Sequence, residues 1–157
     1  MTADTYSVRD LKNMEGNIIE ALGFDLNRTT ALQLLEGMLE NGDSMEKSET
    51  MKTMNDKAIS LCKYAIETAL FEGLGKKYTP LTMVMAAMSL AENSLKCKME
   101  TKLQPTAKVG RVEIAECFKD MCLFMQGSNK FDLTAIKRKY GKNRNHQVSK
   151  IKITMNE

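Results

Sequence analysis

Apolar residues recur with helical spacing from the start of the chain. Between residues 8 and 22 they fall within an arc of about 160° when successive residues are placed 100° apart around one axis. The members of this arc are Val8, Leu11, Met14, Ile18, Ile19, Ala21 and Leu22. Ser7 precedes the pattern and Asp10 follows three residues later, which predicts a capped amphipathic helix. Glu15 lies inside the same arc, where a carboxylate needs a partner.

The rest of the chain predicts five further helices and no convincing sheet. The first is expected to begin after a Thr29-Thr30 cap and to stop at Asn41-Gly42, and the second to span about 51–72 with a stop at Gly73 and Gly75. The other three are expected from Pro80 past Ala91, at about 112–125 with a stop at Gly127, and at about 133–140. A polar loop, 43–49, separates the first two of these helices, and a loop containing Pro105 and Gly110 separates the third from the fourth. The sequence therefore predicts an all-α fold.

The helix that begins at Pro80 is the expected centre of the domain. Thr79 is its predicted cap, and Pro80 suits the first helical position. From Leu81 to Ala91 only Thr82 and Ser89 are polar, and both lie on one side. A helix that is apolar on nearly every other side must be surrounded by other helices.

Length and composition predict one globular domain. The chain has 157 residues, of which 43% are apolar, and its longest nearly apolar run, 83–91, is far shorter than a membrane span. Its start does not resemble a secretory signal peptide, so we expect a reducing, intracellular compartment and no membrane partner.

The sequence carries no enzymatic motif and no expected cofactor. Cys62, Cys97, Cys117 and Cys122 form no CxxC pair, and the lone His146 lies among basic residues, so no zinc site is expected and the thiols are interpreted as structural. A glycine-rich phosphate loop, an HExxH motif and a Ser-His-Asp arrangement are all absent from the sequence. We therefore expect a protein that is not an enzyme.

Charge is distributed unevenly along the chain. Residues 1–74 carry a net charge of −6 and residues 75–157 a net charge of +9. The segment 137–152 holds seven Lys or Arg and no acid, so it could attract phosphate or an acidic partner. The candidate basic contact surface consists of Lys137, Arg138, Lys139, Lys142 and Arg144. The alternative, a solvated tail, remains open.

Three stretches of the sequence resemble the cyclins of the A and B types. One of them resembles the stretch of cyclins that joins the last helix of the first cyclin box to the second box. Its matching residues are Tyr6-Ser7, Leu11, Met14-Glu15, Ile18-Ile19, Leu22, Phe24-Asp25-Leu26, Thr29 and Leu34-Leu35. Tyr78-Thr79-Pro80-Leu81 and the segment from Lys139-Tyr140 to Val148-Ser149 resemble the central helix and the end of the second box. The resemblance implies a five-helix box around a central apolar helix, preceded by one extra helix.

The implied organisation has three parts. Residues 1–28 would be the last helix of an N-terminal box with a linker, 29–136 the C-terminal box, and 137–157 a basic C-terminal segment. Because the earlier helices of a first box do not precede Tyr6, we expect a piece of a longer cyclin; a naturally short protein whose first helix docks elsewhere is the alternative. Arg28 also departs from the family, which usually has proline there.

The resemblance implies a non-catalytic subunit that binds and helps to activate a cyclin-dependent protein kinase in cell-cycle control. In cyclins the glutamate that matches Glu15 bonds to backbone groups beside the regulatory helix of the kinase. The residues that match Ile19, Phe24 and Leu26 help to form a pocket for an aliphatic side chain of the kinase. Two alternatives remain: a helical scaffold that dimerises, or completes another chain's box, through its first helix, and a cyclin-fold nucleic-acid-binding module, which the acidic first half of the chain disfavours.

Overall fold

The computed structural model describes residues 5–39, 49–99, 110–127 and 134–153. These residues form the helices α1 (Val8–Ala21), α2 (Ala31–Leu39), α3 (Glu49–Phe71), α4 (Pro80–Leu95), α5 (Arg111–Gly127) and α6 (Thr134–Tyr140). Three short 3-10 helices, η1 (Leu74–Lys76), η2 (Asn143–Asn145) and η3 (Val148–Lys150), complete the described part, which contains no strand. The predicted all-α fold is confirmed.

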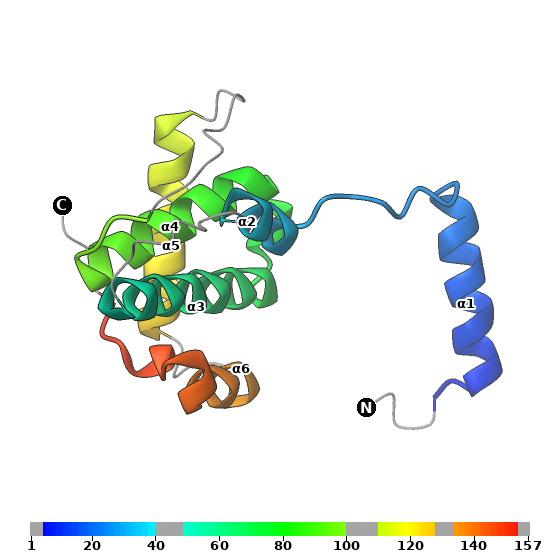
Figure 1. The fold of residues 1–157 in the computed structure, drawn as a ribbon. Coiled ribbons are helices and arrows are strands. Elements are labelled where there is room, and N and C mark those ends of the chain that lie inside the picture. Colours follow the sequence, from blue (N-terminus) through cyan, green and yellow to red (C-terminus); the bar gives the residue numbers. More distant parts are fainter. Residues whose placement is uncertain (1–4, 40–48, 100–109, 128–133, 154–157) are drawn as a thin grey trace.

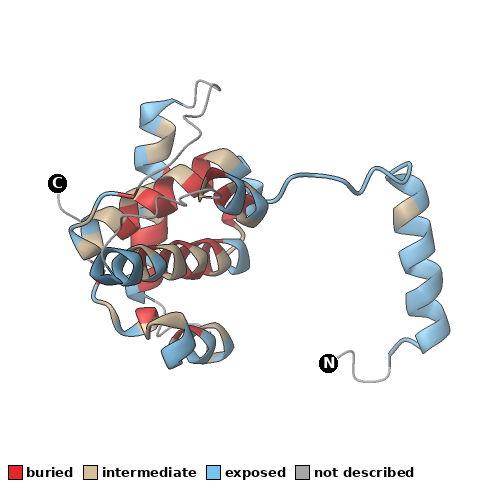
Figure 2. Cartoon of the chain, in the orientation of Figure 1, coloured by how far each residue is buried: buried red, intermediate tan, exposed pale blue. Residues whose placement is uncertain are grey.

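Helix α4 is the centre of the domain, as its apolar sequence predicts. It contacts α2, α3 and α5, and Val84, Ala87 and Leu90 are completely buried. Small alanines in α4 let the neighbouring helices approach closely, and methionines fill the remaining space. Thr82 is also fully buried, and its hydroxyl group is satisfied there by donating a hydrogen bond to Glu113 of α5 at 3.0 Å. Figure 2 shows the buried residues gathered where these helices meet.

The boundaries of α4 follow from local chemistry. The Thr79 hydroxyl accepts a hydrogen bond from the Thr82 amide at 3.2 Å, and Pro80 occupies the first helical position. Lys96 ends the helix in the left-handed region, with a φ of 51°. Gly73, with a φ of 80°, follows α3 at the predicted place. The predicted stop at Asn41-Gly42 and the loops at 43–48 and Pro105 lie outside the described residues.

The C-terminal segment packs against the domain, which corrects the alternative of a solvated tail. Tyr140, Val148 and Ile153 are buried in the common core, and η3 and α6 both contact α3. The ring of Tyr140 lies 5.2 Å from that of Tyr64. These three apolar residues thus anchor the segment, while its basic side chains remain on the surface.

Helix α1 stands apart from the other helices, joined to α2 by an extended linker (Figure 1). It contains no buried residue, and among its side chains only Ile19 is partly buried. The apolar arc predicted from the sequence is therefore present on α1 but is not covered by the described part of this chain (Figure 2).

Candidate functional site

The N-terminus of α1 is held by a reciprocal cap. The Asp10 amide donates to the Ser7 hydroxyl oxygen at 3.2 Å, and the Ser7 amide donates to the Asp10 carboxylate at 2.9 Å. Hydrogen bonds from the Ser7 hydroxyl and amide lower the pKa of Asp10. The predicted cap is confirmed, and it begins the helix without any help from tertiary packing.

The C-terminus of α1 forms a Schellman motif. The Phe24 amide donates to the Ile19 carbonyl at 3.0 Å, and the Gly23 amide donates to the Glu20 carbonyl at 2.9 Å. Gly23 and Phe24 both have positive φ, 59° and 60°, which is unusual for a phenylalanine. This turn brings the Phe24 side chain back to α1, so that Phe24 and Ile19 line one shallow hollow with Gly16.

The four residues expected to bind a partner lie in three settings. Ile19 and Phe24 come together in the hollow, although the Phe24 side chain remains 75% exposed. Leu26 lies in the linker and is also exposed. Glu15 lies outside the hollow, and its carboxylate has no hydrogen bond or ion pair with any described residue. The structure therefore brings two of the four together and leaves the carboxylate accessible.

Exposed apolar side chains surround Glu15 along α1. Between 51% and 71% of the surface of Val8, Leu11, Ile18 and Leu22 is accessible. Monomeric soluble proteins seldom expose a continuous apolar stripe of this kind unless it binds something. We call this surface, from Val8 to Leu22 with Glu15 at its centre, the α1 face.

Arg28, at the position where cyclins usually have proline, makes two contacts within the linker after α1. The Arg28 amide donates to the Leu26 carbonyl at 3.0 Å, a hydrogen bond that proline cannot make. Its guanidinium group bonds to Asp25 at 2.5 Å. Both contacts are exposed, so they restrict the linker only modestly.

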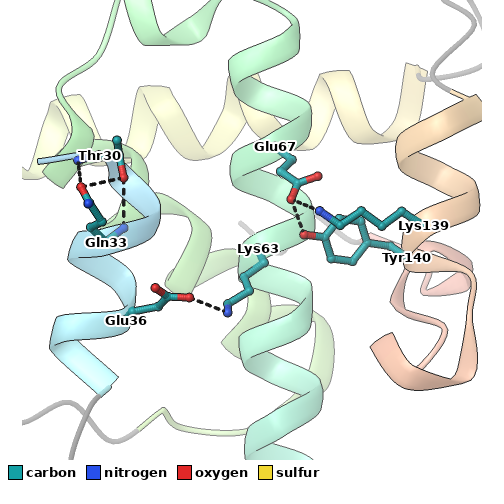
Figure 3. A network of polar contacts seen from close by, with 7 residues as sticks. All are labelled: Thr30, Gln33, Glu36, Lys63, Glu67, Lys139 and Tyr140. Carbon is teal, nitrogen blue, oxygen red and sulfur yellow. Dashed lines mark hydrogen bonds and ion pairs between the residues drawn. The ribbon is translucent and has the colours of Figure 1, made fainter. Parts of the chain in front are cut away.

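The predicted basic surface is partly engaged by the chain itself. Lys139 forms an ion pair with Glu67 of α3, and the Tyr140 hydroxyl donates to the same carboxylate at 2.8 Å (Figure 3). Arg138, Lys142 and Arg144 are exposed. Lys137 is exposed and also has an interaction partner. Lys139 therefore anchors the segment, and the contact role of the others remains a prediction.

Comparison with known proteins places this fold in a family. The model of the family "Cyclin, C-terminal domain" matches residues 30–154. The chain belongs to the cyclin C-terminal domain family. It is also 29% identical, over 153 residues, to the "G2/mitotic-specific cyclin-A" of Spisula solidissima. That alignment covers 95% of this chain and 33% of the relative, so the chain spans about a third of the length of the curated protein it matches.

The family match fits the described domain. Residues 30–154 include α2 to α6 and the C-terminal segment that packs on α3, whereas α1 precedes the matched range. The resemblance to a second cyclin box is confirmed. No described helix of this cyclin domain combines the length and apolar character that crossing a bilayer requires.

Several polar residues that tie the cyclin box together had no sequence signal. Asp120 of α5 accepts hydrogen bonds at 2.8 Å from both the Lys77 ammonium group and the Tyr78 hydroxyl. The bond from Lys77 lowers the pKa of Asp120 and raises that of Lys77. Glu67 plays a similar part between α3 and α6. Helical periodicity assigns these carboxylates to polar faces but cannot show which distant residues meet them.

The thiols of the box are structural in their surroundings. Cys62, Cys117 and Cys122 are fully buried, and burial raises the pKa of Cys117 to about 12 and that of Cys122 to about 11. The Cys62 thiol lies 3.6 Å from the Met99 sulfur atom. Such thiols remain protonated at neutral pH and are poor nucleophiles. In the described ranges no group of His, Cys, Asp and Glu is placed to hold a metal ion.

Proposed function

We propose that this chain acts as, or within, a cyclin subunit that binds and helps to activate a cyclin-dependent protein kinase in cell-cycle control. Membership of the cyclin C-terminal domain family supports the assignment to a regulatory class of protein. The observation that carries the proposal is the α1 face, an uncovered apolar stripe with an unpaired carboxylate at its centre. In this proposal Glu15, Ile19, Phe24 and Leu26 contact the kinase, which implies action in the nucleus and cytoplasm.

The chemistry of the α1 face suits a partner that offers backbone donors. A carboxylate that becomes covered by a partner must regain its hydrogen bonds, or its desolvation opposes binding. Backbone amide groups beside the regulatory helix of a kinase would satisfy Glu15, while Ile19 and Phe24 would bury an aliphatic side chain. Charge and apolar surface together would thus select one kind of partner surface.

Activation then follows from differential binding. A subunit shifts a kinase toward its active conformation only if it binds that conformation more tightly than the inactive one. The consequence in the kinase is alignment of its Lys-Glu ion pair. The chain itself performs no chemistry in this proposal. Because the proposed contact rests on one helix and its linker, we expect residues 1–157 alone to bind weakly and to stimulate little.

Two matched variants test the role of Glu15. Binding to a purified cyclin-dependent kinase is measured by biolayer interferometry for the wild type, Glu15→Ala and Glu116→Ala. Both glutamates are exposed, but Glu116 lies on α5, outside the α1 face and the hollow. We expect Glu15→Ala to weaken binding by about tenfold, the cost of losing hydrogen bonds to a charged group, and Glu116→Ala to leave it unchanged.

Two results would contradict the proposal. One is no detectable kinase binding at millimolar chain concentration, and a second is an equal loss of affinity in the two variants. Full stimulation of a purified kinase by residues 1–157 would instead contradict the expected weakness of the isolated chain. Circular dichroism checks that α1 remains helical in each variant.

The exposed apolar stripe also supports a second candidate, in which α1 pairs with another chain. Dimerisation, or completion of another chain's helical box, would bury Val8, Leu11 and Ile18 without any kinase. Light scattering of the wild type, Ile19→Asp and Phe24→Asp distinguishes the candidates. A dimer that these variants dissociate favours the scaffold, and a wild-type monomer favours the kinase-binding subunit.

A further inference from the structure

A second unoccupied surface lies at the other end of the domain. The start of α3 and the residues after α4 form a groove of about 600 Å³, within the usual size range of binding sites. Its lining residues are Thr50, Met51, Met54, Asn55, Lys96, Cys97 and Lys98. Both segments lie at the end of the domain away from α1 (Figure 1), so the groove is separate from the α1 face.

The groove combines an apolar floor with a positive rim. Met51 and Met54 are 57% and 40% exposed, which is unusual for large apolar side chains, and Cys97 is partly buried beside them. Lys96 and Lys98 are exposed and form no ion pair with any described residue. Methionine side chains adapt to different apolar partners, and free lysines at the edge attract carboxylates.

The backbone that carries the two lysines is held in place. The Met99 amide donates to the Glu92 carboxylate at 2.7 Å, and the Cys97 amide donates to the Glu92 carbonyl at 3.2 Å. The buried side chain of Met99 packs against Cys62. Lys96 itself has a φ of 51°, at a position where glycine is the usual residue. This anchoring keeps a strained lysine at the rim and lowers the entropic cost of binding there.

We propose that this groove is a docking site for a short acidic segment of another protein, one that carries a large apolar side chain beside its carboxylates. The apolar side chain would fill the space over Met51 and Met54, and the carboxylates would pair with Lys96 and Lys98. Among the described residues that line the groove there is no aromatic ring on which a base could stack, and the cationic side chains are Lys96 and Lys98, so a nucleic acid is disfavoured. The site is independent of the proposed kinase contact.

A labelled peptide tests the site on the full chain. The probe is the fluorescein-labelled peptide EDLEFDE, and the control peptide, EDSESDE, keeps the charge without the apolar side chains. Fluorescence anisotropy measures affinity for the wild type, for Lys96→Glu with Lys98→Glu, and for the matched control Lys76→Glu with Lys119→Glu. All four lysines are exposed, so both double variants should fold. Methyl NMR spectra of the wild type, assigned with Met51→Leu and Met54→Leu, report directly on the floor of the groove.

We expect EDLEFDE to shift the methyl signals of Met51 and Met54 and to bind about tenfold more weakly to Lys96→Glu with Lys98→Glu. The control variant should keep wild-type affinity, and EDSESDE should bind poorly to every protein. The proposal is wrong if neither methyl signal moves at millimolar peptide, or if both double variants lose affinity equally. Equal competition by a short DNA duplex, or a chain dimer that the Lys96→Glu and Lys98→Glu changes dissociate, would also overturn it by assigning the groove to another occupant.

Discussion

Replacing Glu67 with alanine should release the C-terminal segment from the domain. Glu67 lies on α3 and receives both the Lys139 ammonium group and the Tyr140 hydroxyl group of α6 (Figure 3). Tyr140 is only 3% exposed, so its hydroxyl cannot readily turn to water once the carboxylate is gone. The variant therefore leaves a buried donor without its acceptor, in addition to breaking an ion pair.

The hydrogen bond and the ion pair to Glu67 contribute different amounts to the free energy of unfolding. The hydrogen bond from a neutral hydroxyl to a charged acceptor is worth about 1.5–3 kcal/mol. The Lys139 and Glu67 side chains are 48% and 28% exposed, so solvent screening limits the ion pair to about 0–1 kcal/mol. Glu67→Ala should thus lower the free energy of unfolding by about 2–3 kcal/mol. For a chain of this length that corresponds to a fall in Tm of about 5–10 °C.

Urea denaturation and hydrogen exchange measure the effect. Asp56→Ala is the matched control. Asp56 also lies on α3, but it is exposed and its carboxylate forms no hydrogen bond or ion pair with another described residue. Exchange in the Glu67→Ala variant should accelerate most at residues 140–153, since these depend on the lost contact. The Asp56→Ala variant should show neither change.

A double-mutant cycle gives the decisive result. Tyr140→Phe removes the hydroxyl and keeps the ring, so combining it with Glu67→Ala isolates the hydrogen bond between them. We expect a coupling energy of about 1 kcal/mol or more. Strictly additive losses of unfolding free energy, with no local rise in exchange at 140–153, would refute the reasoning.

The pH dependence provides an independent check of the same contact. Burial, together with the hydrogen bond to Glu67, raises the pKa of Tyr140 above its unfolded value of about 10. A raised folded-state pKa contributes stability that is present below pH 10 and is lost as the pH rises toward the folded-state pKa. Wild-type stability should therefore decline at alkaline pH more steeply than that of Tyr140→Phe in urea denaturation.

Three further variants test other parts of the domain by urea denaturation. Leu90→Ala should cost about 2–5 kcal/mol by opening a cavity beside the central helix, whereas the exposed Leu123→Ala should cost less than about 0.5 kcal/mol; equal losses would contradict the packing described. Thr79→Ala should cost about 1 kcal/mol through loss of the α4 cap, and Thr79→Ser should retain most of it; a serine as harmful as alanine would argue against capping. The pKa of Asp120 is lowered, chiefly by Lys77, so the stability it contributes above pH about 4 is lost as the pH falls through its folded-state pKa; Asp120→Asn should flatten the stability curve in that acidic range, and an unchanged curve would disprove this linkage.

Helix α1 buries none of its residues against the described part of the chain, and its two caps supply part of the stability that it lacks. A helix of 14 residues is marginal in water without tertiary contacts. The cap at Ser7 and the Schellman turn at Gly23 satisfy backbone groups at both ends, which favours the helix before any partner arrives. A preformed helix has less conformational entropy to lose on binding, which would favour the contact proposed for the α1 face.

Local patterns in the sequence were enough to predict the helices and the central helix of the fold. Ser7 and Thr79-Pro80 predicted two caps correctly, because capping is decided within one turn of helix. The nearly uniform apolar character of α4 likewise predicted its central place, since only surrounding helices can bury such a surface. The cyclin box itself was expected only because stretches of the sequence resemble the cyclins, and the family match confirms it.

The packing of the helices against one another determines which distant polar groups meet and which surfaces stay uncovered. Glu67 and Tyr140 are 73 residues apart, and Tyr78 and Asp120 are 42 apart, so helical periodicity carries no information about their pairing. The same limit applies to Val148 and Ile153, because the weak periodicity of the C-terminal segment did not reveal that they complete the core. Local spacing records the face on which a residue lies, but the way the bundle closes determines what that face touches.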